Sequence, residues 1–334
     1  MPTVLTYFSV FISFFATFII LPYWIKRAKE HNLLLTDVHK TDQRQIPGLG
    51  GLIVVFGIVM GVMAYVALHT FYYDDKKNAL VLFAATSSIL LSALIGLVDD
   101  LLGRKIGLRQ YQKPILTLFV ALPVMVINAG TAIITLPFIG QTNLGILFPL
   151  IFIPAGIVGA SNAFNMLAGM NGLEAGMGLI LTATIGYISF TNNSIPAAIL
   201  AACVFFAVLA FWLYNKYPAK ILCGNTFTYS IGTSIALIAI IGNIEKYALI
   251  LFLPYYIEFL LKLRGFMQKE TLVNVRPDGS LVHRYRKWYA TPHVVMSLLQ
   301  KCRIKPREWA VVFIIHFITA MLALIVLWMY FFGR

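Results

Sequence analysis

Long apolar segments separated by short polar loops dominate this sequence of 334 residues, of which 60% are hydrophobic and 12% charged. So little polar surface could not coat a soluble globule. A bilayer core requires about 20 mainly apolar residues per helix. Ten segments come near that length: 5–25, 49–71, 79–98, 114–129, 145–162, 174–191, 195–214, 226–241, 247–263 and 309–332. The sequence predicts an all-α, polytopic membrane protein of about ten transmembrane helices, forming a single domain over residues 1–334.

Basic residues are distributed unevenly between the two sets of loops that ten spans would create. The loops near 26–48, 99–113, 215–225 and 262–308 hold 22 of the 26 Lys and Arg residues. Because cytoplasmic loops carry the excess of Lys and Arg, we expect these loops to be cytoplasmic and both termini extracytoplasmic. Anionic membrane lipids and a phosphorylated substrate then account for the net charge of +13, and no nucleic acid is needed.

Candidate site residues gather on this predicted cytoplasmic face, in the loops 26–48, 99–113, 162–173, 215–225 and 264–308. Asp99 and Asp100 directly follow the third span. Placing a carboxylate so close to hydrocarbon costs free energy, so such residues are usually paired or have a function. They could bind a divalent cation or accept a proton. A plain helix end in water is the alternative, and the basic residues downstream, Lys113 among them, favour a function.

Three asparagines in ten residues mark the boundary between the fifth and sixth spans. Asn162 and Asn165 are three residues apart, so their side chains share one face of a helix end. Their amide oxygens could meet a hard cation or sugar hydroxyls. Gly169 lets the backbone approach a flat ligand closely. An ordinary capped turn would explain one Asn and one Gly but not Asn171 as well.

The polar stretch 264–308 carries the signal of a short cytoplasmic β-hairpin over 270–287. Its turn sequence, Arg276-Pro-Asp-Gly-Ser, separates two partly alternating arms. If the second arm is a strand, Arg284 and Arg286 share one face and His283 lies on the other. Two neighbouring guanidiniums suit a pyrophosphate.

Two further charged residues allow more than one interpretation. Lys40 could bind substrate or could serve only as a topology charge in the loop before the second span. Glu258 is an acid inside a predicted span, and Lys262 one turn later makes a helix-end ion pair the alternative to a function.

Three motifs in this order resemble the polyprenyl-phosphate N-acetylhexosamine-1-phosphate transferase superfamily, over essentially the whole chain. They are Leu97-Val-Asp99-Asp100, the run from Asn162 to Gly176, and Cys223-Gly-Asn-Thr-Phe-Thr-Tyr229. The segment Ala168-Gly-Met-Asn-Gly-Leu-Glu174 is similar to the eukaryotic and archaeal branch that makes dolichyl-diphosphate GlcNAc. The compact loops and the hairpin favour an archaeal member, in the cell membrane, over an enzyme of the endoplasmic reticulum membrane.

The resemblance implies a phosphoglycosyl transferase that needs Mg²⁺ or Mn²⁺. It would move GlcNAc-1-phosphate from UDP-GlcNAc to a membrane polyprenyl (dolichyl) phosphate and release UMP. This is the first step of lipid-linked oligosaccharide synthesis for N-glycosylation. A homodimer is compatible with this assignment.

The family motifs also imply roles for single residues. Asp99 and Asp100 match the catalytic aspartate pair, and Lys113 matches a phosphate-binding lysine. Asn165 matches a metal ligand. Asn225 stands where the family has an aspartate as metal ligand, so the site carries less negative charge and should bind the metal more weakly unless substrate phosphates contribute.

A second set of residues is implied to bind the nucleotide sugar. Asn162 matches a site amide, and Gly169 and Asn171 fall where the uracil is recognised. The basic cluster that holds the pyrophosphate and the sugar is matched by His283, Arg284 and Arg286.

Two rival functions are compatible with the composition. A transporter or flippase would also carry polar groups in a helical bundle, although such groups usually lie near the bilayer midplane. The same chemistry could also use another UDP-N-acetylhexosamine, such as UDP-N-acetylgalactosamine, or undecaprenyl phosphate as acceptor.

Overall fold

The computed structural model describes residues 4–136 and 140–332, and at 4–7 and 104–106 only the backbone. Within these residues, eight helical segments are long and apolar enough to cross a bilayer. They belong to α1 (Val4–Glu30), α2 (Gly50–Phe71), α3 (Ala79–Ile106), η1 with α6 (Phe148–Phe152 and Ile153–Met166), α7 (Leu173–Thr191), α8 (Ile195–Asn215), α9 (Gly224–Gly242) and α13 (Glu308–Phe332). The predicted all-α, polytopic membrane architecture is therefore confirmed.

The predicted spans 114–129 and 247–263 are each two short helices. The first consists of α4 (Gln112–Phe119) and α5 (Leu122–Val126), the second of α10 (Glu245–Leu251) and α11 (Leu253–Arg264). Pro123 and Pro254 stand in the first turn of the second helix of each pair. Proline has no N–H for the preceding turn, so the helix stops and starts again. Whether these pairs complete ten crossings stays a prediction.

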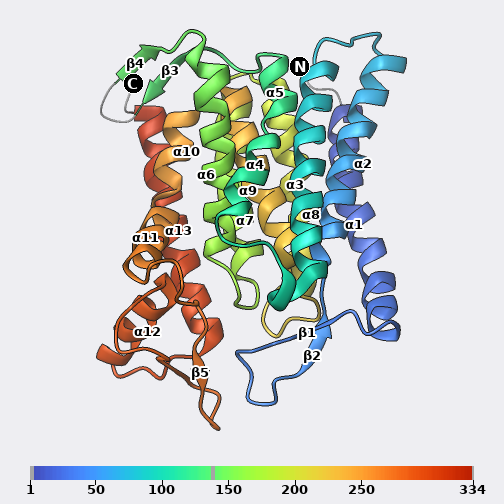
Figure 1. Ribbon diagram of the computed structural model, residues 1–334. Helices are drawn as coiled ribbons and strands as arrows, with labels where there is room; N and C mark the ends of the chain where they lie inside the picture. Colours follow the sequence, from blue (N-terminus) through green and yellow to red (C-terminus); the bar gives the residue numbers. More distant parts are fainter. Residues whose placement is uncertain (1–3, 137–139, 333–334) are drawn as a thin grey trace.

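Helix α9 lies at the centre of the bundle and packs against α2, α3, α6, α7 and α8 (Figure 1). Two glycines let its neighbours approach. A Cβ on Gly96 of α3 would lie 2.6 Å from backbone atoms of Asn225 and Thr226, and one on Gly232 of α9 would lie 2.6 Å from the carbonyl oxygen of Ala160 in α6. Small residues at helix crossings allow such contact. The polar ends of α3 and α6 are thereby brought beside the start of α9.

The two ends of the bundle carry different structures (Figure 1). Helix α1 begins and α13 ends at the upper end, as an even number of crossings requires, and the antiparallel pair β3 (Ile133–Leu136) and β4 (Gly140–Asn143) also lies there. The lower end, here called the loop end, carries the pair β1 (Leu34–Thr36) and β2 (Gln45–Pro47), the pair β5 (Asn274–Val275) and β6 (Leu281–Val282), and helix α12 (Thr291–Lys301). The sequence did not predict the first two strand pairs or α12.

The predicted hairpin at 270–287 exists but is shorter than expected. Its strands are β5 (Asn274–Val275) and β6 (Leu281–Val282), joined by a turn in which the Arg276 N–H donates to the Ser280 carbonyl. The first arm offers only two residues for pairing, so the chain after Val282 has no partner strand. The expectation that Arg284 and Arg286 share a strand face is therefore wrong.

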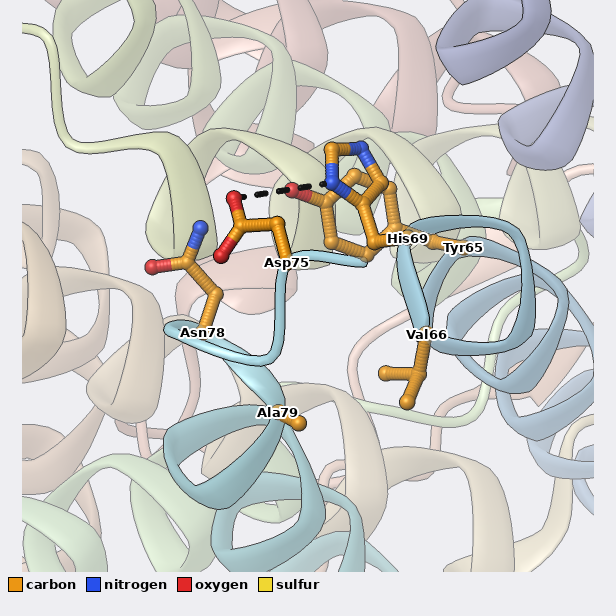
Figure 2. A pocket seen from close by; sticks show the side chains of 6 residues that line it. All are labelled: Tyr65, Val66, His69, Asp75, Asn78 and Ala79. Carbon is orange, nitrogen blue, oxygen red and sulfur yellow. Dashed lines mark ion pairs between the residues drawn. The ribbon is translucent and has the colours of Figure 1, made fainter. Parts of the chain in front are cut away.

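A small group of mainly polar residues lines a pocket at the connection between α2 and α3 (Figure 2), which lies at the upper end of the bundle (Figure 1). The rings of Tyr65 and His69 lie 4.2 Å apart, and His69 Nδ1 lies 3.9 Å from a carboxylate oxygen of Asp75. Asn78, which also lines this pocket, immediately precedes α3. The cluster therefore ties the end of α2 to the turn before α3, far from the loop end.

The close approach of α3 to α9 can be tested with one methyl group. Gly96→Ala is expected to lower thermal stability in mild detergent by about 1–3 kcal/mol, because overpacking forces backbone shifts. Gly159→Ala is the matched control, since a Cβ there meets no atom within 4 Å. Equal melting temperatures for wild type and Gly96→Ala would contradict the packing described.

Candidate active site

Asp100, near the loop end of α3, caps the first turn of α9. One carboxylate oxygen accepts a hydrogen bond from the Asn225 N–H at 2.7 Å, and the other accepts from the N–H and the hydroxyl of Thr226 at 2.9 and 2.8 Å. Gly224 has φ 74°, and a Cβ there would lie 2.6 Å from the same carboxylate. An anion at a helix N-terminus is stabilised by the free N–H groups and the helix dipole. Asp100 therefore fixes where α9 begins.

Asp99 connects three segments through its buried carboxylate. Oδ2 accepts hydrogen bonds from Lys113 Nζ at 2.6 Å and from Asn225 Nδ2 at 2.9 Å, and Oδ1 accepts from the Leu108 N–H at 2.9 Å. Only 6% of its surface is exposed. Such a buried ion pair needs all its partners, because removing one leaves an uncompensated charge. The predicted convergence of Asp99, Lys113 and Asn225 is thus observed.

Asn165 of α6 lies against α9 beside this group. Its carbonyl oxygen accepts from the Thr228 hydroxyl at 2.7 Å, and its amide nitrogen donates to the Tyr229 hydroxyl at 3.3 Å. The same Thr228 hydroxyl also donates to the backbone carbonyl oxygen of Asn225 at 3.1 Å. The amide of Asn162, three residues earlier in α6, donates to the Thr117 hydroxyl of α4 at 2.9 Å. The two asparagines therefore contact different helices.

Three side chains with oxygen atoms near the start of α9 are the candidates to hold a divalent cation. The candidate donors are one carboxylate, of Asp99, and the amide oxygens of Asn165 and Asn225, and oxygen donors are what Mg²⁺ prefers. Within residues 4–136 and 140–332, no three His, Cys, Asp or Glu side chains gather as a metal site. The protein therefore supplies few negative charges, and a bound cation would depend on substrate phosphates for the rest.

Lys40 lies in a second cluster, where sequence reasoning missed its two acidic partners. It forms a short ion pair with Glu308 at the start of α13, and its Nζ lies 3.4 Å from a carboxylate oxygen of Asp37. It also lies 4.5 Å from the centre of the Tyr217 ring. Glu308 immediately precedes an apolar segment, just as Asp99 directly follows one, so its position next to hydrocarbon was a usable signal.

Asn171 is the hub of this second cluster. Its backbone N–H donates to the Glu308 carboxylate at 2.7 Å. Its side-chain oxygen, Oδ1, accepts from Lys40 Nζ at 3.1 Å and from the Ala219 N–H at 2.9 Å. Its amide nitrogen donates to Asp37 at 3.4 Å, and only 2% of the residue is exposed. Asn171 thus holds together the loops before α2, α7 and α9 and the start of α13.

Gly169 stays exposed next to this hub. Its φ of 112° favours glycine, and its N–H donates to the carboxylate of Glu174, a further acid that the sequence analysis passed over, at 2.7 Å. The loop before α7 is therefore held by a side chain from the first turn of α7 itself, and Gly169 lies at the surface of this loop.

Of the predicted basic cluster, His283 contacts α12 through a 2.9 Å hydrogen bond with the Ser297 hydroxyl. Arg284 is paired at 2.8 Å with Glu270, and both side chains are exposed. Arg286 is exposed and has no ion pair among the described residues. No contact within residues 4–136 and 140–332 joins these arginines to Asp99.

Three imidazoles at the loop end are held neutral by burial. Burial lowers the pKa of His39 to about 4, and it lowers the pKa of His293 to about 4 as well. It also lowers the pKa of His283.

Glu258 has the helix-end partner that the sequence allowed. Its carboxylate lies 3.8 Å from Lys262 Nζ, and its other oxygen accepts from the Thr291 N–H at 2.6 Å. The ion pair between Glu258 and Lys262 is therefore confirmed, and Glu258 ties α11 to the start of α12.

Comparison with known proteins identifies the family. A model described as glycosyl transferase family 4 matches residues 81–243. A relative from Saccharolobus solfataricus is 35% identical over 95% of this chain and 94% of its own length, and it is provisionally named UDP-N-acetylglucosamine–dolichyl-phosphate N-acetylglucosaminephosphotransferase. The chain belongs to glycosyl transferase family 4. The predicted superfamily and enzyme class are thereby confirmed, and the transporter alternative is not favoured.

Two other members show how widely the family spreads. A Dictyostelium discoideum protein that carries the same name without the provisional mark is 27% identical over 75% of this chain and 71% of its own length. A phospho-N-acetylmuramoyl-pentapeptide-transferase from Halalkalibacterium halodurans is 31% identical over 75% of this chain and 79% of its own length. A eukaryotic and a bacterial relative thus each align with three quarters of this chain.

The pair Lys40–Glu308 can be tested with a double-mutant cycle. Lys40→Met and Glu308→Gln are each expected to lower the free energy of unfolding by about 3 kcal/mol, because each breaks an ion pair whose carboxylate is buried. The double variant should lose less than the sum, as seen in thermal unfolding. The control pair is exposed Arg27–Glu30, 3.1 Å apart, whose coupling should stay below about 0.5 kcal/mol. Additive losses at Lys40 and Glu308 would refute their coupling.

Proposed function

We propose that this chain transfers GlcNAc-1-phosphate from UDP-GlcNAc to a membrane polyprenyl phosphate of the dolichyl type, giving polyprenyl-diphosphate-GlcNAc and UMP. The observation that carries the proposal is the contact of Lys113 and Asn225 with Asp99 at the loop end of three helices. The relatives named for this reaction in Saccharolobus and Dictyostelium support it.

Direct transfer agrees with the residues present. An oxygen of the lipid phosphate attacks the β-phosphorus of the donor, the bond to the bridging oxygen breaks, and UMP leaves with that oxygen. Lys113 offers a cation for the phosphates, with Asp99 holding it in place. Preorganised cations aimed at developing charge are a major source of catalysis. Cys223 is buried and lies 3.6 Å from Asn215, and Cys203 is also buried, so neither is placed as a nucleophile.

We assign the cation site to Asp99, Asn165 and Asn225, with Mg²⁺ or Mn²⁺ as the ion. When bound, the cation neutralises charge on the diphosphate. Gly169, exposed beside the buried Asn171, offers its backbone to the uracil. Lys40, Asn162, His283, Arg284 and Arg286 remain the proposed contacts to the rest of the nucleotide sugar.

The proposed topology follows the charges. The loop end holds the loops with 22 of the 26 Lys and Arg residues, so it faces the cytoplasm, and the two termini face outward across ten crossings. A water-soluble donor then enters from the cytoplasm, and the lipid phosphate enters from the bilayer. The full-length match to the Saccharolobus relative favours an archaeal cell membrane.

Release of UMP tests this assignment. Purified protein with Mg²⁺, dolichyl phosphate and UDP-GlcNAc should release UMP, and Lys113→Ala should lower kcat by about 100- to 1,000-fold. Arg109→Ala removes an exposed cation from the same loop and should change kcat less than about threefold. The Asp99→Asn, Asp100→Asn double variant should be inactive. Full activity of that variant, or faster release from UDP-N-acetylgalactosamine or with undecaprenyl phosphate, would overturn the roles or the substrates proposed.

The neutral Asn225 gives a second test. Its amide nitrogen donates to Asp99, and Asn225→Asp would place two carboxylates in contact. Without metal, Asn225→Asp should therefore lower thermal stability by about 1–3 kcal/mol. Added Mg²⁺ should raise its melting temperature more than that of the wild type.

Asn162→Asp is the matched control for Asn225→Asp. The Asn162 amide donates to the hydroxyl of Thr117 and to a backbone carbonyl rather than to a carboxylate. The response of this control to Mg²⁺ should equal that of the wild type. The same response in Asn225→Asp would exclude Asn225 from the cation site.

A further inference from the structure

A cavity of about 200 Å³ lies at the loop end, between the β5–β6 turn and the segment that leads from α12 to α13. Arg276 from the turn and Arg303 and Lys305 from the segment line it together. The two walls are joined by a backbone hydrogen bond of 2.7 Å from the Leu281 N–H to the Pro306 carbonyl. A water occupies about 30 Å³ of liquid, so the cavity has room for a hydrated polar group.

The cavity carries an excess of positive charge. Lys305 is paired with Asp278 at 3.0 Å, and both side chains are exposed. Arg276 and Arg303 have no ion pair and no side-chain hydrogen bond among the described residues. Two guanidiniums and one partly neutralised ammonium thus face a single space. Guanidinium groups bind phosphate oxygens in pairs, with geometric specificity.

The chain around the cavity also places it near the surface of the bilayer. The segment ends where α13, a candidate span, begins at Glu308. Ile304, which lines the cavity, is 53% exposed, and Trp309 in the first turn of α13 is 50% exposed. Exposed Trp at the end of a span is typical of the membrane interface, and basic residues just outside a span attract anionic head groups.

We propose that this cavity binds the phosphate group of a phosphate ester, with Arg276 and Arg303 as its principal ligands. The exposed apolar side chain of Ile304 beside the basic groups favours a lipid-borne phosphate over a soluble one. The site is separate from the proposed reaction, because no residue of the Asp99 or Lys40 clusters lines it. The result of a binding test at this cavity therefore neither supports nor contradicts the proposed function.

Binding of defined probes to the full-length protein in neutral detergent tests the site. Short-chain phosphatidylglycerol is the lipid probe, phosphatidylcholine of equal chain length the zwitterionic comparison, and glycerol phosphate the soluble one. The Arg276→Gln, Arg303→Gln double variant should raise the Kd for phosphatidylglycerol about 100-fold, roughly tenfold for each guanidinium. The Lys287→Gln, Lys301→Gln variant removes the same charge from exposed positions outside the cavity and should change the Kd less than about threefold.

The outcomes separate the two phosphate sources. Phosphatidylglycerol bound at least tenfold more tightly than glycerol phosphate assigns the site to lipid, and equal affinities assign it to soluble phosphate esters. The Arg276→Lys, Arg303→Lys variant keeps the charge and should retain part of the affinity, so a loss in the Gln variant is not a folding defect. Equal losses in both Gln variants, equal binding of phosphatidylcholine, or no binding of any phosphate probe would overturn the proposal.

Discussion

The contact between Asp100 and the first turn of α9 determines where the rest of the candidate site lies. Three hydrogen bonds attach one carboxylate to the N–H groups of Asn225 and Thr226 and to the Thr226 hydroxyl. They are possible only because Gly96 and Gly224 have no side chains. With α9 fixed in this way, the Asn225 amide faces Asp99 and the Thr228 hydroxyl faces Asn165. A helix cap thus defines the geometry of the proposed cation site.

Two partly buried lysines at the loop end are each held by a buried carboxylate from another segment of the chain. Lys113 of α4 is paired with Asp99 of α3, and Lys40 is paired with Glu308 of α13. Buried pairs contribute little net stability compared with apolar packing, but each is costly to break. They therefore specify the arrangement of the loops more than they strengthen it. On the proposed function, substrate phosphates meet lysines that are already oriented.

The sequence predicted most of the membrane helices because their apolar runs have the length of a bilayer. It also placed Asp99, Lys113 and Asn225 on one side, because charge asymmetry reports topology. Local pattern could not show that Pro123 and Pro254 divide two segments. The pairing of Lys40 with Glu308, 268 residues apart, was also beyond it, because such contacts depend on how helices pack. Strands of two to four residues are too short to show a clear alternation of apolar and polar residues. Helix α12 lies within the polar stretch 264–308, which the sequence analysis interpreted only as a loop with a hairpin.

Asn225 shows how contacts change the meaning of a substitution. As a sequence difference, an amide in place of the aspartate implied by the family resemblance is a loss of negative charge at the proposed cation site. In the structure the amide nitrogen donates to Asp99 at 2.9 Å while Lys113 donates to the same oxygen at 2.6 Å. An aspartate could not make that bond unless it were protonated, and it would place two carboxylates against each other. The amide therefore lets a single buried carboxylate and its lysine stay paired, and on the proposed function the remaining negative charge for the cation would come from the phosphates of the substrate.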